Sequence, residues 1–194
     1  MSMKAKKVFQ KDDYKSNDGM LTAVWGPSLW HSLHAISFNY PINPSNEEKK
    51  NYKNWVKNLK YVLPCKYCRV NLVKNFKQLP LTSKNMKNRE TFSRYIYNLH
   101  ELVNKMLGKQ SGLTYCDIKE RYEHFRARCG KRTTVKNNKK KEDGCVDPLN
   151  GVKSKCIIKI VPQEQRENTF QMKKSCKTVR SNVTKKNKTL RGRK

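Results

Sequence analysis

The sequence predicts an all-α protein: a four-helix bundle with a short fifth helix, followed by a basic and largely irregular C-terminal tail. The three tryptophans and all nine tyrosines lie before residue 123, so the residues available for a hydrophobic core lie in the first two thirds of the chain. Apolar residues recur there at spacings of three and four, without alternation of period two. Lysine and asparagine dominate beyond residue 130.

The N-terminal part of the chain predicts a lead segment and a first helix. Residues 1–20 are polar and rich in lysine, so we expect a disordered basic lead. Gly26-Pro27 opens a helical pattern, with the proline in the first turn, where a missing N–H is tolerated. Apolar residues share one face over residues 29–38, and Pro41 ends the helix.

The second and third helices meet at a proline. Ser45 followed by Glu48 has the form of a capping box, and an apolar stripe at helical spacing comes after it. Pro64 breaks this helix. Helical periodicity resumes directly afterwards, so Cys65 and Cys68 are expected at the opening of the third helix.

The fourth and fifth helices complete the predicted bundle. The apolar pattern over residues 92–107 indicates a longer helix that Gly108 terminates. Thr114 with Asp117 predicts the cap of a fifth helix that runs to about Cys129. We therefore assign residues 21–129 to one helical domain.

Residues 130–194 form a basic tail that contains cysteines and is expected to be either disordered or docked on the bundle or a partner. The tail holds 20 Lys/Arg and 5 Asp/Glu, a net charge of +15, against 24 and 10 in residues 1–129, a net charge of +14. Such a charge attracts nucleic acid, anionic membranes or acidic proteins without specifying which. An apolar run at 156–161 is consistent with a lone strand, which is not stable by itself.

Cysteine usage is unusual for a chain that shows no export signal. The N-terminus has no signal peptide, and no apolar stretch reaches the roughly 18 residues that a membrane span requires. Seven cysteines are nevertheless present. Because reducing compartments rarely retain structural disulfides, we expect catalytic or metal-binding roles for some of these cysteines.

Cys65 and Cys68 are the strongest candidates for chemistry. Their spacing places them on one helix face, and the unpaired N–H groups of a helix N-terminus stabilise a thiolate. The pKa of the first cysteine is the one that this position lowers, so we expect Cys65 to exchange with a substrate thiol.

Taken alone, this pair is as often half of a zinc site as a redox pair. A zinc site needs two further ligands. No second cysteine pair of this spacing follows, and His31 and His34 are too close in sequence for a histidine pair of zinc-finger type. A thioredoxin-type motif would require a βαβ setting, which this sequence lacks.

Three motifs in order identify the family that this sequence resembles. Residues 26–34 match G-x-x-x-W-x-x-x-H, residues 61–68 resemble Y-x-x-x-P-C-x-x-C, and residues 99–107 resemble H-N-x-V-N-x-x-L. Residues 25–129 therefore resemble the Erv/ALR family of FAD-linked sulfhydryl oxidases. The resemblance implies that Cys68 lies beside the flavin ring and that electrons pass from substrate dithiols through Cys65 and Cys68 to FAD and then to O2.

The resemblance and the needs of a flavin pocket together predict the residues that contact FAD. Trp30 and Tyr67 are expected to flank the ring system, and His34, His100 or Tyr122 to stack on adenine. The pyrophosphate needs cations, which Lys105, Lys109 and Arg126 supply. The predicted FAD contacts are Gly26, Trp30, His34, Tyr67, His100, Val103, Asn104, Leu107, Lys109 and Tyr122. Without the joint pattern, Trp30 would be a core residue and the histidines ordinary helix residues.

Several positions depart from the family pattern. Glu101 stands where the family has asparagine, and Pro27 where many members have arginine. Tyr97 lies where the partner of Cys116 in a structural disulfide is expected, so Cys116 lacks that partner. Cys129 would lie about 20 Å from Cys116 along a straight helix, too far for direct pairing.

The remaining cysteines have two possible roles. Relatives often carry a shuttle pair on an arm, and here the candidates are in the tail: Cys145, Cys156 and Cys176. The alternative is that they pair with Cys129 or with each other to tether the tail. An odd number of cysteines leaves at least one for an unpaired or intermolecular role.

The Arg126-Ala127-Arg128-Cys129 ending and residues 144–156 resemble the sulfhydryl oxidases of large cytoplasmic DNA viruses. This implies dithiol substrate proteins of the virus, O2 as acceptor with H2O2 as product, a homodimer, and a location in the host cytoplasm (virus factory) or the virion. The alternative function is that of a basic zinc-binding or nucleic-acid-binding virion structural protein, in which the tail is the principal functional part.

Overall fold

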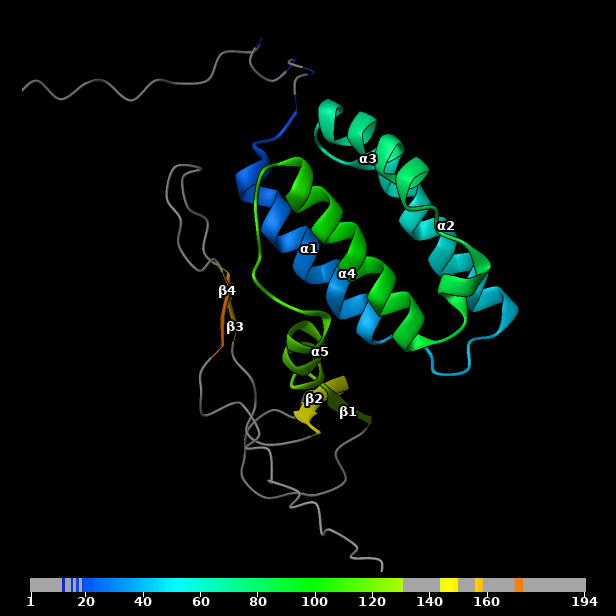
Figure 1. Cartoon of the computed structure of the whole chain (residues 1–194). Helices are drawn as coiled ribbons and strands as arrows, with labels where there is room; N and C mark the ends of the chain where they lie inside the picture. The colour runs from blue at the N-terminus through cyan, green and yellow to red at the C-terminus, as the bar shows by residue number, and fades with distance from the viewer. Residues whose placement is uncertain are drawn as a thin grey trace, which may run out of the picture. The chain divides into compact units, whose positions relative to one another are not determined.

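The computed structural model describes residues 12, 15, 17, 19–130, 144–149, 156–158 and 170–172. Most of the predicted lead and tail, Cys176 included, lies outside these residues. The helices make up one compact unit, and β1 and β2 belong to a second. The helical unit consists of α1 (Thr22–Phe38), α2 (Asn46–Val62), α3 (Lys66–Gln78), the 3-10 turn η2 (Ser83–Met86), α4 (Arg89–Met106) and α5 (Tyr115–Glu123) (Figure 1).

Local sequence signals place the helix starts. Ser45 and Glu48 form the predicted capping box of α2: the Ser45 hydroxyl accepts from the Glu48 N–H at 3.2 Å, and the Glu48 carboxylate accepts from the Ser45 N–H at 2.7 Å. Asn88 caps α4 by accepting from the Thr91 N–H at 3.0 Å. Such caps satisfy N–H groups that have no partner within the helix.

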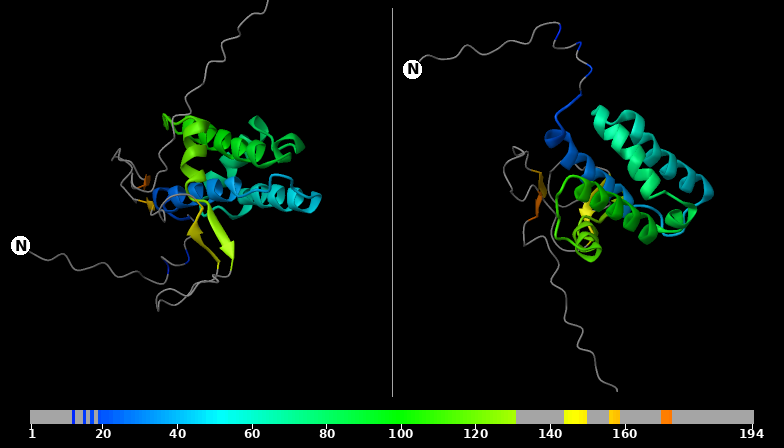
Figure 2. Two further views of the ribbon diagram at one scale, coloured as in Figure 1. Left: turned by 90° about the horizontal axis from the view of Figure 1, so that it is seen from below. Right: turned by 45° about the horizontal axis from the view of Figure 1, so that its top comes forward.

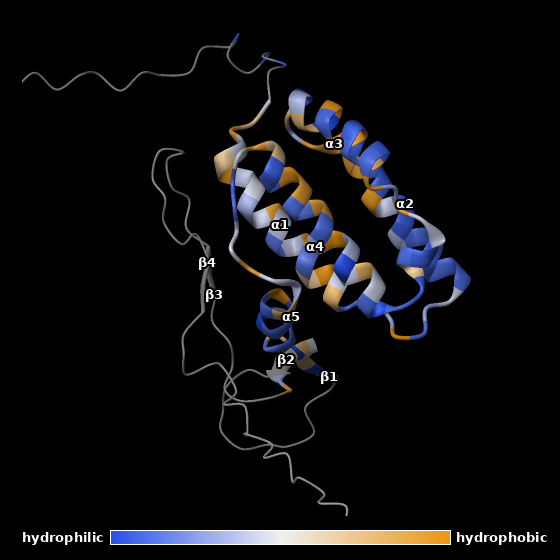
Figure 3. Cartoon of the chain, viewed as in Figure 1, coloured by the Kyte–Doolittle hydropathy of each residue, from blue (hydrophilic) through white to orange (hydrophobic). Residues whose placement is uncertain are grey.

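The core lies between two helix pairs. α1 runs alongside α4, and α2 alongside α3 (Figures 1 and 2). Figure 3 shows α2 and α3 mostly hydrophilic in that view, interrupted by isolated hydrophobic residues. Twelve of the buried residues form one hydrophobic cluster: Leu33, Tyr40, Val56, Leu59, Leu63, Leu72, Leu81, Met86, Phe92, Tyr95, Ile96 and Leu99. Its burial is the main stabilisation of the bundle.

Buried tyrosine hydroxyls in this core have backbone partners. The Tyr40 hydroxyl donates to the Met86 carbonyl at 3.0 Å, and the Tyr95 hydroxyl donates to the Leu79 carbonyl at 3.0 Å. The first bond ties the segment after α1 to η2, and the second ties α4 to the end of α3. Both remove the cost of burying a polar group.

Two predicted helix boundaries are wrong. α1 begins at Thr22, so Pro27 lies inside the helix and not in its first turn. Because proline has no N–H, α1 lacks one helical hydrogen bond at this position. The fifth helix ends at Glu123 and not near Cys129, because the following residues 127–130 adopt the extended backbone of a strand.

The C-terminal part contains short strand pairs that the sequence did not predict. β1 (Ala127–Gly130) pairs with β2 (Gly144–Pro148) in an antiparallel ladder with an irregular register. A disulfide bond between Cys129 and Cys145 crosses this pair. β3 (Cys156–Ile158) pairs with β4 (Phe170–Met172), so the strand predicted from the apolar run has a partner.

No helix in the described part of the chain is both long and apolar enough to cross a bilayer.

We predict that Ile96→Ala lowers the free energy of unfolding by about 2–5 kcal/mol, because Ile96 is 0% exposed and its truncation leaves a cavity. Chemical denaturation followed by tryptophan fluorescence measures this change. Ile42→Ala is the matched control, since Ile42 is 63% exposed and its truncation should change stability by less than about 0.5 kcal/mol. Equal effects at the two positions would contradict the assignment of the core.

Candidate active site

Cys65 caps the N-terminus of α3 with its own side chain. Its backbone is extended, with φ −150° and ψ 120°, and its sulfur accepts a hydrogen bond from the Cys68 N–H at 3.2 Å. Pro64 ends the previous segment and disfavours continuous helix at this point. Both cysteines are half-buried free thiols at the opening of α3, as the sequence predicts.

The surroundings of the two sulfurs favour a charge on Cys65. Burial raises the pKa of the Cys65 thiol, but hydrogen bonds from Cys68, from the Thr22 side chain and from the Tyr67 N–H outweigh it and lower this pKa overall. Burial and the neighbouring Cys65 sulfur raise the pKa of Cys68. The thiolate therefore forms first on Cys65, and Cys68 keeps its proton.

Thr22 is a contact that sequence reasoning missed. Its hydroxyl oxygen lies 3.9 Å from the Cys68 sulfur, although the two residues are 46 positions apart. A threonine at the start of a helix is ordinary, so no local signal marks it. The packing of α1 against the start of α3 brings it to the dithiol.

An aromatic cluster joins α1, α4 and α5. The Trp30 and His100 rings stack with centroids 4.0 Å apart and planes 6° apart. The ring centroids of His34 and Tyr122 are 5.3 Å apart, and the Phe38 ring stacks on the Tyr122 ring with centroids 5.4 Å apart. Four of the predicted FAD contacts, from three helices, thus come together at one place.

The two histidines of this cluster bind one another. His34 Nε2 and His100 Nδ1 are 3.0 Å apart, so one donates to the other. Burial is the main reason that the pKa of His34 falls to about 3, and the neighbouring His100, His31 and Arg121 lower it further. Burial lowers the pKa of His100 to about 4. His34 Nδ1 is buried and has no hydrogen-bond partner within the described part of the protein. A buried polar atom of this kind usually has a partner, which a ligand can supply.

The predicted contacts on α4 follow one face of that helix. Val103, Asn104 and Leu107 lie three, four and seven positions after His100, and the first two are half-buried. The Lys109 N–H donates to the Asn104 carbonyl at 2.8 Å, which fixes the chain just after the helix. The Asn104 side-chain amide donates at 3.0 Å to Glu101, the residue that departs from the family pattern.

The two remaining predicted contacts are Gly26 and Tyr67. Gly26 is buried inside α1, where an added Cβ would lie 3.6 Å from Thr22. Tyr67 is 80% exposed beside the dithiol.

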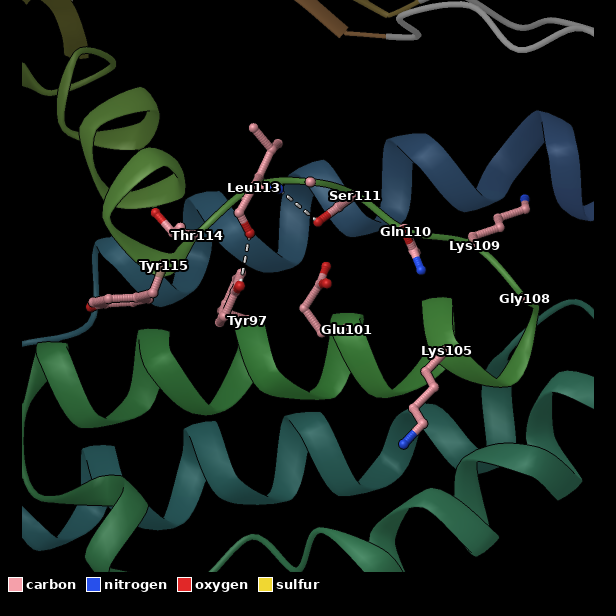
Figure 4. Close-up of a pocket in the computed structure, with 11 residues that line it drawn as sticks. Tyr97, Glu101, Lys105, Gly108, Lys109, Gln110, Ser111, Leu113, Thr114 and Tyr115 are labelled. Atoms are coloured by element: carbon pink, nitrogen blue, oxygen red, sulfur yellow. Dashed lines mark hydrogen bonds between the residues drawn. The ribbon is translucent and has the colours of Figure 1, made fainter.

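A pocket of about 720 Å³ lies between α4 and the segment that follows it. Tyr97, Glu101 and Lys105 line it from α4, and the segment from Gly108 onward arches over them (Figure 4). Lys105 and Lys109, two of the cations predicted for the pyrophosphate, line this pocket, whereas no residue of the aromatic cluster does. The pocket is therefore not the space around the aromatic cluster.

Tyr97 links α4 to the segment before α5 by a hydrogen bond. Its hydroxyl donates to the Leu113 carbonyl at 2.8 Å and ties α4 to the segment before α5 (Figure 4). Cys116, one residue into α5, is an exposed free thiol. The expectation that Cys116 lacks a partner at position 97 agrees with this arrangement.

Among the cysteines outside the dithiol, Cys129 and Cys145 form a disulfide and are both exposed. Pairing of Cys129 with Cys145 is one of the arrangements that the sequence leaves open. No three His, Cys, Asp or Glu side chains in the described ranges are placed to hold a metal ion.

The arrangement at Cys65 and Cys68 is that of a thiol–disulfide redox pair in a helical protein. Comparison with known proteins gives the family: the Erv1/Alr family model matches residues 27–126, and the chain belongs to this family.

The relatives include several viral proteins. The chain is 36% identical over 99 residues to a probable FAD-linked sulfhydryl oxidase of Acanthamoeba polyphaga mimivirus, covering 51% of this chain and 68% of that protein. It is 31% identical to an FAD-linked sulfhydryl oxidase of African swine fever virus, covering 51% of this chain and 80% of the relative. A crystal structure of a cysteine-to-serine double mutant of Erv1 from Saccharomyces cerevisiae aligns with a TM-score of 0.49 at 23% identity, over 54% of this chain and 66% of that one.

The buried histidines predict that stability falls in acid. In the unfolded chain both titrate near 6.5, whereas in the folded protein His34 and His100 stay neutral down to about 3 and about 4. Between these limits only the unfolded chain takes up protons, so the free energy of unfolding falls by about 1.4 kcal/mol per pH unit for each histidine as pH decreases.

Urea denaturation from pH 7 to pH 5 measures this dependence. His100→Gln should flatten the slope by the contribution of one histidine, whatever it does to stability at pH 7. An unchanged slope would show that His100 is not held neutral by burial.

Proposed function

We propose that this chain is an FAD-dependent sulfhydryl oxidase that forms disulfides in protein substrates and passes the electrons to O2, producing H2O2. The single observation that supports this most strongly is the Cys65 side chain as the cap of α3, with Cys68 one turn into the helix. Membership of the Erv1/Alr family and the names of its viral relatives support the same activity.

The oxidised enzyme carries a Cys65–Cys68 disulfide. A substrate thiolate attacks the Cys65 sulfur, so that a mixed disulfide forms and Cys68 leaves and takes up a proton. A second substrate thiolate then attacks the substrate sulfur of the mixed disulfide, and Cys65 leaves. Two electrons of the substrate dithiol have then reached the Cys65–Cys68 pair. Of the two protons lost by the substrate thiols, one is balanced by the proton that Cys68 takes up and the other is released to solvent, because Cys65 leaves as a thiolate. Because its pKa is lowered, Cys65 is a good leaving group in the second step.

The residues around the aromatic cluster fit FAD. Trp30 and His100 offer flat faces for stacking, and the buried His34 Nδ1 has the capacity for one more hydrogen bond. Bound FAD supplies the two-electron acceptor that reoxidises the dithiol and delivers the electrons to O2. We propose that Trp30, His34, His100 and Tyr122 hold it, while Gly26, Tyr67, Val103, Asn104, Leu107 and Lys109 complete the set of contacts.

Cys68→Ser should abolish oxidation of a small dithiol, because the Cys65–Cys68 disulfide can no longer form, while the purified protein keeps its yellow flavin absorbance. Oxygen consumption and the visible spectrum measure the two properties. Cys116→Ser is the matched control and should retain full activity, since Cys116 is a free thiol outside the site. Colourless wild-type protein with stoichiometric zinc would instead support the basic zinc-binding virion protein.

We further propose dithiol proteins of a virus as substrates, in the host cytoplasm (virus factory) or in the virion. Similarity to the sulfhydryl oxidases of mimivirus, African swine fever virus and an invertebrate iridescent virus supports this setting. A homodimer and attraction of nucleic acid or anionic surfaces by the basic tail stay proposals, and sedimentation of the purified protein tests the first.

The exposed Cys129–Cys145 disulfide supports a tether more than a shuttle, because the bond crosses β1 and β2 and so links segments of the C-terminal unit. The double variant Cys129→Ser/Cys145→Ser should therefore oxidise both a small dithiol and a reduced protein substrate at the wild-type rate. A loss confined to the protein substrate would establish a shuttle role for this pair.

A further inference from the structure

The residues just before α1 lie on the backbone of the redox motif. The Met20 N–H donates to the Pro64 carbonyl at 2.7 Å, and Gly19 forms an isolated antiparallel bridge with Cys65. The Trp25 indole N–H donates to the Met20 carbonyl at 3.0 Å. Hydrogen bonds thus attach Met20 both to Pro64 and to the Trp25 side chain of α1. We call residues 19–22 the clamp segment.

Gly19 is the residue that permits this approach. Its φ of +111° lies in the region that disfavours side chains. A Cβ on Gly19 would lie 2.7 Å from the Pro64 carbonyl oxygen and 3.3 Å from the Cys65 Cα. Gly112 also has a positive φ, of +65°, but a Cβ there would meet nothing within 4 Å. The two glycines share an unusual conformation, and only Gly19 has a close backbone neighbour.

The bridge acts on the conformation that Cys65 needs. A residue that caps a helix with its side chain has an extended backbone, and Cys65 has φ −150° and ψ 120°. Antiparallel pairing with Gly19 stabilises extended backbone at the same residue. The crossing therefore favours the geometry in which the Cys65 sulfur accepts from the Cys68 N–H.

The clamp segment also carries a hydroxyl to the dithiol. Thr22 is its last residue and the first of α1, and its oxygen lies 3.9 Å from the Cys68 sulfur. Hydrogen bonds from the Thr22 side chain lower the pKa of both thiols. The groups that act on Cys65 thus come from the clamp segment and from the first turn of α3, where Tyr67 and Cys68 supply the others.

We propose that residues 19–22 are a positioning element of the redox site: Gly19 and Met20 hold Cys65 in its helix-capping conformation, and Thr22 places a hydroxyl at the two sulfurs. This inference rests on the proposed redox function of Cys65 and Cys68. It makes Gly19, Met20 and Thr22 positioning residues, because the substrate sulfur bonds to Cys65 itself.

The test is the pH profile of Cys65 alkylation in the full-length, FAD-containing protein, reduced and kept under nitrogen. Iodoacetamide is the probe, and peptide mass spectrometry separates Cys65 from Cys68 and Cys116. Gly19→Val should move the Cys65 profile to higher pH and slow its alkylation at pH 7 by about threefold or more, because less thiolate is present.

Gly112→Val is the control, because it also places a β-branched side chain at a positive φ but without a close neighbour, and it should leave the Cys65 profile unchanged. Thr22→Val keeps the shape of the side chain and removes the hydroxyl, so it should move the profile in the same direction even if Gly19→Val fails to fold. Alkylation of Cys116 should be the same in every variant and so reports the reagent alone.

An unchanged Cys65 profile in Thr22→Val and in folded Gly19→Val would overturn the positioning role. Failure of the proposed function has a different signature: wild-type protein without flavin, or with flavin but without thiol oxidation. The alkylation profile requires neither turnover nor O2, so the two failures are distinguishable.

Discussion

The hydrogen bond from the Cys68 N–H to the Cys65 sulfur is the interaction on which the site depends. It satisfies one of the N–H groups that a helix start leaves without a partner, and it places a potential negative charge at the positive end of α3. Together with the contact between the two sulfurs and with the hydrogen bonds from Thr22 and Tyr67, this bond lowers the pKa of Cys65, while burial and the Cys65 sulfur raise that of Cys68. One cysteine is thereby suited to exchange with a thiol, and the other to remain protonated beside it.

The bundle supports this bond from two directions. The cluster of buried side chains keeps α3 beside α2 and α1 beside α4, which sets where the start of each helix lies. The start of α1 then reaches the dithiol through Thr22, and its middle supplies Trp30 and His34 to the aromatic cluster with His100. One helix thus takes part in both halves of the proposed electron path, the thiols and the flavin pocket.

Prediction from sequence succeeded where a local signal determines the structure. The capping box at Ser45, the proline before Cys65 and the apolar periodicity of α4 each act within a few residues, and each has the expected result. Prediction failed at the start of α1 and at the end of α5. Neighbours distant in sequence decide those ends: Pro64 accepts from Met20 ahead of α1, and β2 pairs with the residues that follow α5.

The sequence by itself determined the helical class, the position of the dithiol at a helix start and the family, because periodicity, caps and motif spacing are local properties of the chain. Only the tertiary structure decided that Gly19 lies on Cys65, that Thr22 reaches Cys68 and that His34 binds His100. These contacts join residues 46 or more positions apart. They depend on how helices pack, and no short pattern of residues encodes that packing.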